Sequence, residues 1–251
     1  MRRAPANESS HRSHRENRRR DRWVARCRCR DRAPPRARRR VRGHRLPVPL
    51  CRDLGVHAWA EAGDLSRPEE ADALFARADT EFDGLDIFVG NHGIWPPDAV
   101  ALADMTDEQW HRTMGANLHS IFYTCRAAAR RLRDDGRVVL VTSTAAQRGE
   151  SFHGDYASSK GAMVSLVKGL CIELAPRGIT VNSVAPGWIE TDMTAEVLAG
   201  EAGERVAAAI PIGRVASAED VAGPIVFLCS ALGRHVTGEI LNVNGGAVLP
   251  G

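Results

Sequence analysis

The stretch "GRVVLVTSTAAQRGESFHGDYASSKGAMVSLVKGLCIELAPRGITVNSVAPG", residues 136–187, decides the fold class of this 251-residue chain. It begins with an apolar run typical of a buried strand, at 136–143, and ends with another at 179–187. Between them, residues 153–176 carry the pattern of a helix. Two apolar strands joined by a helix predict a parallel pair with a right-handed crossover.

The same alternation continues on both sides of this stretch. The sequence predicts strands at 56–64, 85–93 and 238–246, and helices at 67–82, 106–133 and 218–232. We therefore expect an α/β fold of one domain, a Rossmann-like doubly wound parallel sheet with helices on both faces. In such sheets the ligand lies at the carboxyl ends of the strands.

Polar or turn residues stand at four of these strand ends: Asp64, Asn91, Ser143 and the pair Pro186-Gly187. One such residue is ordinary turn chemistry. Four in successive strands meet at one edge of a parallel sheet, which indicates a binding site there.

Tyr156 and Lys160 lie four residues apart on the predicted helix, so they share one face. Tyrosine ionises near pH 10, too high for acid–base work at neutral pH, and a nearby ammonium lowers that pKa. The hydroxyl of Ser143 is suited to hydrogen-bond a substrate oxygen on which charge develops. These three side chains favour proton transfer to or from an alcohol oxygen.

With these motifs in view, the chain resembles the short-chain dehydrogenase/reductase family over about residues 52–251. The resemblance lies in motifs that follow one another at family spacing: "NHG" (91–93), "ANL" (116–118), "YASSK" (156–160), "APG" (185–187), "IET" (189–191) and "NVNGG" (242–246). His92 replaces the usual small residue of the first motif, either crowding the cofactor or pointing into a loop.

The resemblance implies roles for individual residues. Tyr156 would be the general acid/base and Lys160 would lower its pKa and hold the nicotinamide ribose. Ser143 would orient the substrate carbonyl, and Asn117 would support a proton relay through water. The remaining cofactor-binding positions implied are Asp64, Asn91, Gly93, Pro186, Gly187, Ile189 and Thr191, and no metal is implied.

Within the family the chain looks most like the β-ketoacyl-acyl-carrier-protein reductases, through "VAPGWIETDM" (184–193) and "TGEILNVNGG" (237–246). This implies reduction of a small or acyl-carrier-bound ketone with NADP(H) or NAD(H), NADPH being favoured, in a homotetramer. The same subgroup holds other alcohol, sugar and secondary-metabolite dehydrogenases. Residues 188–212 would form a mobile substrate lid.

The first 45 residues differ in composition from the rest of the chain. They hold 18 Arg, no Lys and four acids, whereas residues 46–251 hold 16 Lys and Arg against 27 Asp and Glu, a net charge of −11. An acidic body argues against a nucleic-acid-binding domain. No apolar run reaches the length of a membrane span, and six scattered cysteines favour free thiols in a reducing cytoplasm.

Residues 1–50 also lack the T-G-x-x-x-G-x-G loop with which the family binds the cofactor pyrophosphate. A shift of the reading frame by one base accounts for this absence. Trp23 has the single codon TGG and Val24 begins with G, so the shifted codon is glycine, and residues 21–28 permit T-G-G-S-R-G-A-G. We therefore expect residues 1–50 to be irregular or disordered, and residues 51–251 to form the catalytic domain.

Two alternatives for the arginine-rich segment remain open. It could be a nucleic-acid-binding arm on a catalytically impaired protein, or a transit peptide, which is typically rich in Arg and poor in acids. The frameshift is favoured over both, because one shifted frame permits the whole glycine-rich string and also requires glycine at Trp23.

Overall fold

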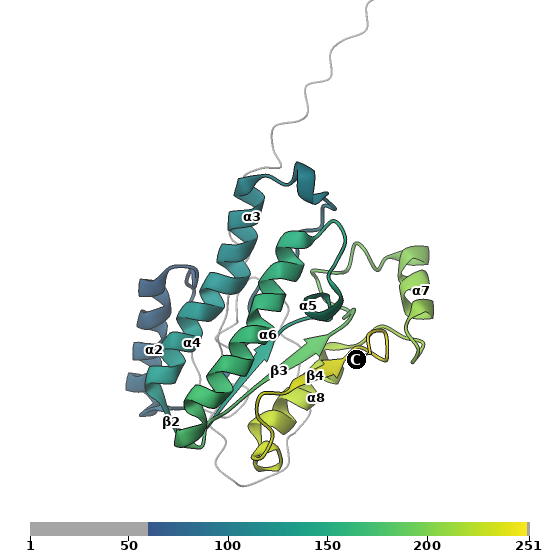
Figure 1. The fold of residues 1–251 in the computed structure, drawn as a ribbon. Coiled ribbons are helices and arrows are strands. Elements are labelled where there is room, and N and C mark those ends of the chain that lie inside the picture. Colours follow the sequence, from purple (N-terminus) through teal and green to yellow (C-terminus); the bar gives the residue numbers. More distant parts are fainter. Residues whose placement is uncertain (1–59, 250–251) are drawn as a thin grey trace, which may run out of the picture.

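The computed structural model describes residues 60–249, and Figure 1 shows their fold. Four parallel strands form a single sheet in the order β1-β2-β3-β4. They are β1 (Leu85–Gly90), β2 (Leu132–Val141), β3 (Thr180–Pro186) and β4 (Ile240–Val243). The expected α/β fold with a parallel sheet is confirmed.

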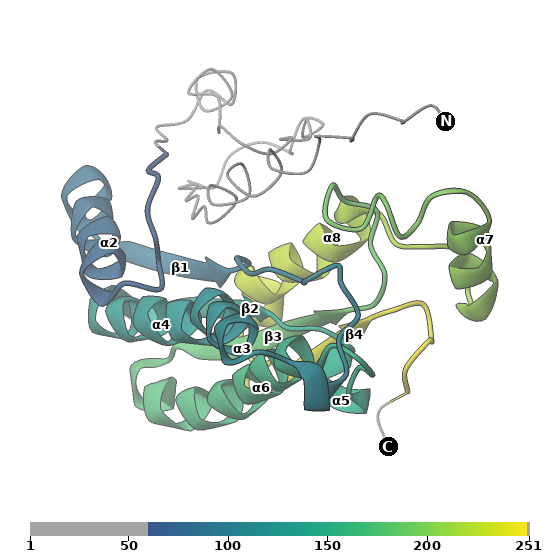
Figure 2. The ribbon, with the colours of Figure 1, turned by 90° about the horizontal axis from the view of Figure 1, so that it is seen from above.

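Helices cover both faces of this sheet, as Figure 2 shows from above. On one face lie α2 (Pro68–Phe82), α4 (Ser120–Arg131) and α6 (Gly154–Leu174), whereas α8 (Ala218–Cys229) packs on β2, β3 and β4 from the other face. The remaining helical elements are η2 (Leu102–Asp104), α3 (Asp107–Met114), η3 (Gly115–His119), α5 (Ala145–Arg148), η4 (Ala175–Arg177), α7 (Gly200–Ala209) and η5 (Ala231–Gly233). No helix in the described range is long and apolar enough to cross a membrane.

Local chemistry explains where several helices begin. Pro68 opens α2, and Glu69 and Glu70 stand in its first turn, where negative charge meets the positive end of the helix. At α8, Ser217 and Asp220 form a capping box in which each side chain accepts from the other's backbone N–H. These caps fix the helix starts that the sequence predicts at 67 and 218.

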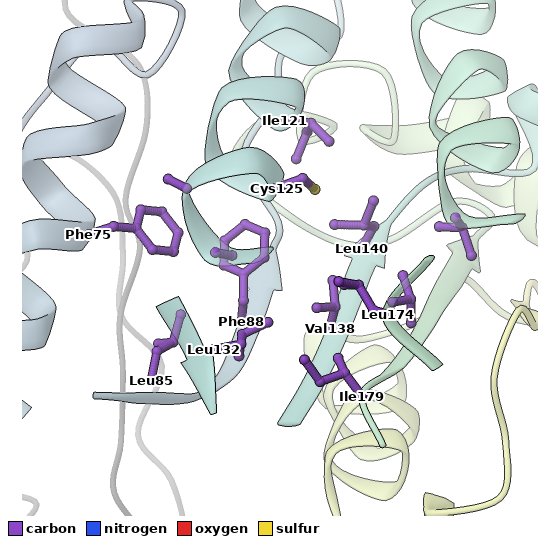
Figure 3. Close-up of a cluster of buried hydrophobic side chains, with 14 of the residues drawn as sticks. Phe75, Leu85, Phe88, Ile121, Cys125, Leu132, Val138, Leu140, Leu174 and Ile179 are labelled. Atoms are coloured by element: carbon purple, nitrogen blue, oxygen red, sulfur yellow. The ribbon is translucent and has the colours of Figure 1, made fainter. Parts of the chain in front are cut away.

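The main core lies between the sheet and the face covered by α2, α4 and α6, and Figure 3 shows part of it. The ring of Phe75 on α2 meets Phe88 on β1 edge to face, with 5.4 Å between centroids. Ile121 and Leu140 are fully buried, so α4 and β2 are held together by apolar packing, which provides most of the driving force for folding. This packing makes the strand ends a rigid base for a site.

The structure corrects two predicted elements. The helix expected over 106–133 is interrupted by a single π-helical turn at η3, and its end, Leu132, already belongs to β2. The strand expected at 56–64 is absent from its described part, 60–64, which carries no regular structure; there the polar contacts of Asp64 with the N–H of Ser66 and of Glu70 with the N–H of Asp64 form a loop instead. The proposed boundary at residue 50 and the arginine-rich segment lie outside the described residues.

Candidate active site

A cavity of about 400 Å³ opens at the carboxyl ends of the strands. Its wall gathers residues that follow β1, β2 and β3, together with the first turns of α6. The predicted site residues that line it are Asn91, Gly93, Ser143, Tyr156, Lys160, Pro186, Gly187, Ile189 and Thr191. Predicted site residues up to 100 positions apart in the sequence thus lie together, at the sheet edge where open α/β sheets bind ligands.

Ser143, Tyr156 and Lys160 converge on this cavity. Ser143 lies just beyond β2, and its hydroxyl oxygen accepts from the N–H of Ala145 at 3.1 Å. Tyr156 stands in the first turn of α6, and the nearby Ser143 side chain acts to lower the pKa of its phenol. Lys160 follows one turn later, with Nζ 6.0 Å from the centroid of the Tyr156 ring.

The electrostatics of this group differ from the sequence-based expectation. Desolvation raises the pKa of Tyr156 to about 12; the Ser143 hydrogen bond acts in the opposite direction, and the charge of Glu150 adds to the increase. Burial also lowers the pKa of Lys160 to about 8, so its ammonium is costly to maintain. In the chain alone, burial outweighs any lowering of the tyrosine pKa by Lys160, and the phenol stays protonated at neutral pH.

Lys160 is held by the strand that precedes the site. Its Nζ donates to the backbone carbonyl of Val141 at 2.8 Å, and the residue is 5% exposed. The carbonyl at the last residue of β2 therefore fixes the ammonium at the end of the sheet. This contact partly offsets the cost of burying a charge.

Asn117 lies behind the cavity and does not line it. It belongs to the π-turn η3, a local irregularity frequent at functional sites. Its Oδ1 accepts from the N–H of Ile94 at 2.7 Å, and its Nδ2 donates to the Ile94 carbonyl and to Ser159 Oγ. Asn117 thus joins the loop after β1 to helix α6.

Two further sequence-based assignments fall outside the cavity. Asp64 precedes α2, and its Oδ1 accepts from both the N–H and the hydroxyl of Ser66; it does not line the cavity with the other predicted residues. His92 is 6% exposed and is also absent from the cavity lining, which agrees with the loop orientation rather than with crowding of a ligand.

The structure adds a buried carboxylate that sequence analysis missed. Asp155 is fully buried; its Oδ2 accepts from the hydroxyl of Thr113 at 2.7 Å and from Gln109, and its Oδ1 accepts from the N–H of Tyr156. Asp155 therefore connects α3 to the first turn of α6 beside the tyrosine. Its place directly before Tyr156 was the only signal in the sequence.

Sequence analysis also missed several aromatic, charged and apolar side chains that line the cavity, called the cavity mouth below: Trp95, Arg148, Glu150, Trp188, Asp192 and Met193. The ring of Trp95 lies edge to face with Trp188, with 6.0 Å between centroids. Residues 188–194 come from the segment expected to be a lid, of which 200–209 form helix α7.

Comparison with known proteins places this arrangement in context. The family model described as enoyl-(acyl carrier protein) reductase matches residues 40–248. L-rhamnose 1-dehydrogenase (NAD(P)(+)) of Azotobacter vinelandii is 39% identical over 195 residues, 76% of this chain and 74% of that protein. The 3-oxoacyl-(acyl-carrier-protein) reductase of Vibrio cholerae is 36% identical over 195 residues, 77% of this chain and 79% of that protein.

Solved structures agree with these relatives. A short-chain dehydrogenase/reductase from Brucella melitensis superposes with a TM-score of 0.71 and 39% identity over 75% of each chain. A blue fluorescent protein from a metagenomic library, in complex with NADPH, gives a TM-score of 0.69 and 33% identity over 74% of each chain. Family match, relatives and fold lead to one assignment: the chain belongs to the short-chain dehydrogenase/reductase family, whose members are NAD(P)-dependent oxidoreductases.

Proposed function

We propose that this chain interconverts a ketone and a secondary alcohol, with Tyr156 as the general acid/base. The observation that carries the proposal is the convergence of Ser143, Tyr156 and Lys160 on one cavity at the carboxyl ends of the strands. A neutral phenol, a hydroxyl and an ammonium are the groups that a carbonyl oxygen needs while negative charge develops on it.

In the direction of reduction, the nicotinamide cofactor supplies the hydride when bound. The Tyr156 phenol donates its proton to the carbonyl oxygen, and the Ser143 hydroxyl holds that oxygen in position by a hydrogen bond. A pKa of about 12 keeps the phenol protonated and ready to donate at neutral pH. The ammonium of Lys160 stabilises the phenolate that remains, and Asn117 positions helix α6 through Ser159.

The cavity suits the nicotinamide half of the cofactor. Gly93 lines it and packs closely on the neighbouring side chains, because an added Cβ would lie 2.9 Å from Asn117 Oδ1 and 3.5 Å from Lys160 Nζ. Pro186 and Gly187 line the same cavity from the end of β3. Lys160 would hold the ribose. We favour NADPH over NADH from the family resemblance, and the NADPH complex of a relative supports it.

For the substrate we propose a 3-oxoacyl thioester, free or carried on an acyl-carrier protein. The 3-oxoacyl-(acyl-carrier-protein) reductases of several bacteria, 35–36% identical, support this class. The test is NADPH consumption by the frame-corrected full-length protein with acetoacetyl-CoA, with Ser143→Ala and Tyr156→Phe as controls. Turnover that both variants retain would contradict the proposal.

A sugar is the second candidate substrate. Two indole rings, Trp95 and Trp188, line the cavity mouth, and aromatic faces pack well against the C–H faces of sugar rings. L-rhamnose 1-dehydrogenase among the relatives supports this candidate. NAD(P)+-dependent oxidation of L-rhamnose, without reduction of acetoacetyl-CoA, would decide for the sugar.

We also propose that the chain assembles as a homotetramer. Phe122 on α4 is 45% exposed and Ile172 on α6 is 73% exposed. Both helices belong to the layer that covers one face of the sheet (Figure 2). Exposed apolar side chains on one layer are the usual material of subunit contacts. Light scattering coupled to size-exclusion chromatography tests the mass, and a monomer at micromolar concentration would contradict the proposal. A cytoplasmic location stays a prediction.

Residues 1–50 require a separate proposal. We propose that they are the first βα unit of the family written in a shifted frame, followed by the catalytic domain at 51–251. Support comes from the codon argument at Trp23 and Val24 and from the missing phosphate-binding loop.

A further inference from the structure

The cavity mouth contains a carboxylate that the proposed chemistry does not use. Glu150 lines the cavity together with Ser143 and Tyr156, and its side chain is only 17% exposed. A carboxylate that is largely withdrawn from water interacts strongly with nearby charges, because solvent screens it poorly. Its place beside the reacting hydroxyls calls for an explanation.

Two aromatic side chains hold Glu150 in place. The indole N–H of Trp95 donates to Glu150 Oε1 at 3.2 Å. The ring of His153 stacks on that indole, with 4.7 Å between centroids and 13° between planes. His153 Nδ1 lies 3.3 Å from the Ser151 carbonyl oxygen and 4.0 Å from Glu150 Oε1, so the carboxylate is fixed at the cavity wall and not free to turn into solvent.

We propose that Glu150 is a specificity-determining residue that admits uncharged ketones and disfavours a free carboxylate separated from the reacting carbonyl group by one methylene. This inference rests on the proposed function, and it holds for esters, thioesters and sugars alike. The substrate excluded is a free 3-oxo acid, whose carboxylate would be placed near that of Glu150.

The effect of Glu150 on Tyr156 supports this selection. The charge of Glu150 raises the pKa of Tyr156, so an anion at the phenol oxygen is already disfavoured. A substrate carboxylate that enters the same cavity beside the reacting carbonyl group meets repulsion of the same kind. The Glu150 carboxylate, held by the Trp95 indole, therefore disfavours anionic substrates beside the reacting groups.

The other charged groups of the cavity are present in both wild type and Glu150→Gln. Arg148 and Asp192 line it but are exposed, where water and salt weaken their interactions. Lys160 is buried and attracts an anion, but its ammonium is held at the end of β2 by the Val141 carbonyl 2.8 Å away and is the same in both proteins. Of the two carboxylates that line the cavity, Glu150 is thus the poorly screened one.

The test compares a matched pair of 3-oxo compounds in the frame-corrected full-length protein: ethyl acetoacetate, which is uncharged, and acetoacetate, which is an anion. Glu150→Gln keeps an oxygen that can accept from Trp95 and removes the charge. We expect kcat/KM for acetoacetate to rise about tenfold relative to the ester, the order expected for one poorly screened charge. Glu190→Gln removes an exposed carboxylate that does not line the cavity and should leave the ratio unchanged.

A binding measurement separates this inference from the proposed function. Saturation-transfer NMR on the full chain reports binding of both compounds without turnover, and wild type should favour the ester while Glu150→Gln favours neither. An unchanged ratio and unchanged binding preference in Glu150→Gln would overturn the inference. If the frame-corrected protein binds NADPH but turns over neither compound, the proposed 3-oxo substrate fails, and the binding preference still decides the role of Glu150.

Discussion

Replacing Lys160 with methionine is expected to stabilise the fold while damaging the enzyme. Burial lowers the lysine pKa from 10.5 to about 8, and each unit of such a shift corresponds to about 1.4 kcal/mol. At pH 7 the charged side chain therefore costs roughly 3 kcal/mol of folding free energy. Methionine has a similar length and no charge, so it removes this cost.

A second contribution opposes that gain. The hydrogen bond from Nζ to the Val141 carbonyl is lost, and an unsatisfied buried acceptor costs about 1–3 kcal/mol. The net expectation is a variant more stable than wild type by about 0–2 kcal/mol at pH 7. Because the two contributions partly cancel, the net value at one pH is a weak test, and the pH dependence is the sharp one.

The sign of the pH dependence follows from the lowered pKa. The unfolded lysine keeps its proton up to about pH 10.5, whereas the folded one releases it near pH 8. Wild type therefore gains stability from this group as pH rises from about 8 to 10.5, and Lys160→Met does not. The advantage of the variant should shrink by about 2 kcal/mol between pH 7 and pH 9.5.

The assay is urea unfolding of the full chain, followed by circular dichroism, with wild type and Lys160→Met at matched pH values. Only the difference between the two proteins is interpreted, because burial also raises the pKa of Cys125 to about 12 and of Cys229 to about 11. These thiols reduce stability at alkaline pH equally in both proteins. Parallel stability curves for the two proteins would show that Lys160 is not buried as described.

The remaining predictions concern catalysis and the gene. In the frame-corrected protein, Tyr156→Phe should lower ketone-reductase turnover by at least about 100-fold while NADPH still binds; near-normal steady-state turnover would remove the tyrosine from its role. Below the Lys160 pKa of about 8, alcohol oxidation should rise about tenfold per pH unit, because it starts from a phenolate with a pKa of about 12, whereas reduction stays level; equal profiles in both directions would contradict this. Sequencing codons 10–55 should give an uninterrupted T-G-x-x-x-G-x-G in the shifted frame, and a stop codon there would refute the frameshift. The frame-corrected protein should bind NADPH in the micromolar range and the chain as written weakly or not at all; equal fluorescence titrations would show that residues 1–50 build a working site.

The fold was predictable because it depends on periodicity. Buried strands such as 136–143 and amphipathic helices such as 67–82 leave a pattern in any short window. The π-turn at 115–119 leaves none, because one additional residue in a helical turn does not change composition. The strand predicted at 56–64 extends too far, because its described part, 60–64, is a loop; residues 56–59 lie outside the described range.

The candidate site was predictable only where a motif carried it. Ser143, Tyr156 and Lys160 stand at family spacing, and the structure brings them to one cavity. Trp95 and Glu150 are 55 residues apart and belong to no motif, so their contact appears only once β1 and β2 lie side by side. The predicted direction of the Tyr156 pKa shift was wrong for the same reason. Residue spacing indicates that a lysine is near but not how deeply the tyrosine is buried, and burial raises the pKa.

The polar contacts of the site connect substrate recognition to the catalytic helix. Asn117 binds both backbone groups of Ile94 and the hydroxyl of Ser159, and Ser159 in turn donates to the carbonyl of Tyr156. The residue after Ile94 is Trp95, which holds the Glu150 carboxylate. These hydrogen bonds link the Trp95 loop to the first turn of α6. A displacement of the loop is therefore transmitted to that turn. Substitutions at the cavity mouth that alter the backbone should change turnover through this chain of contacts, whereas Glu150→Gln preserves the contacts and should act only through charge, on substrate selectivity and on the Tyr156 pKa.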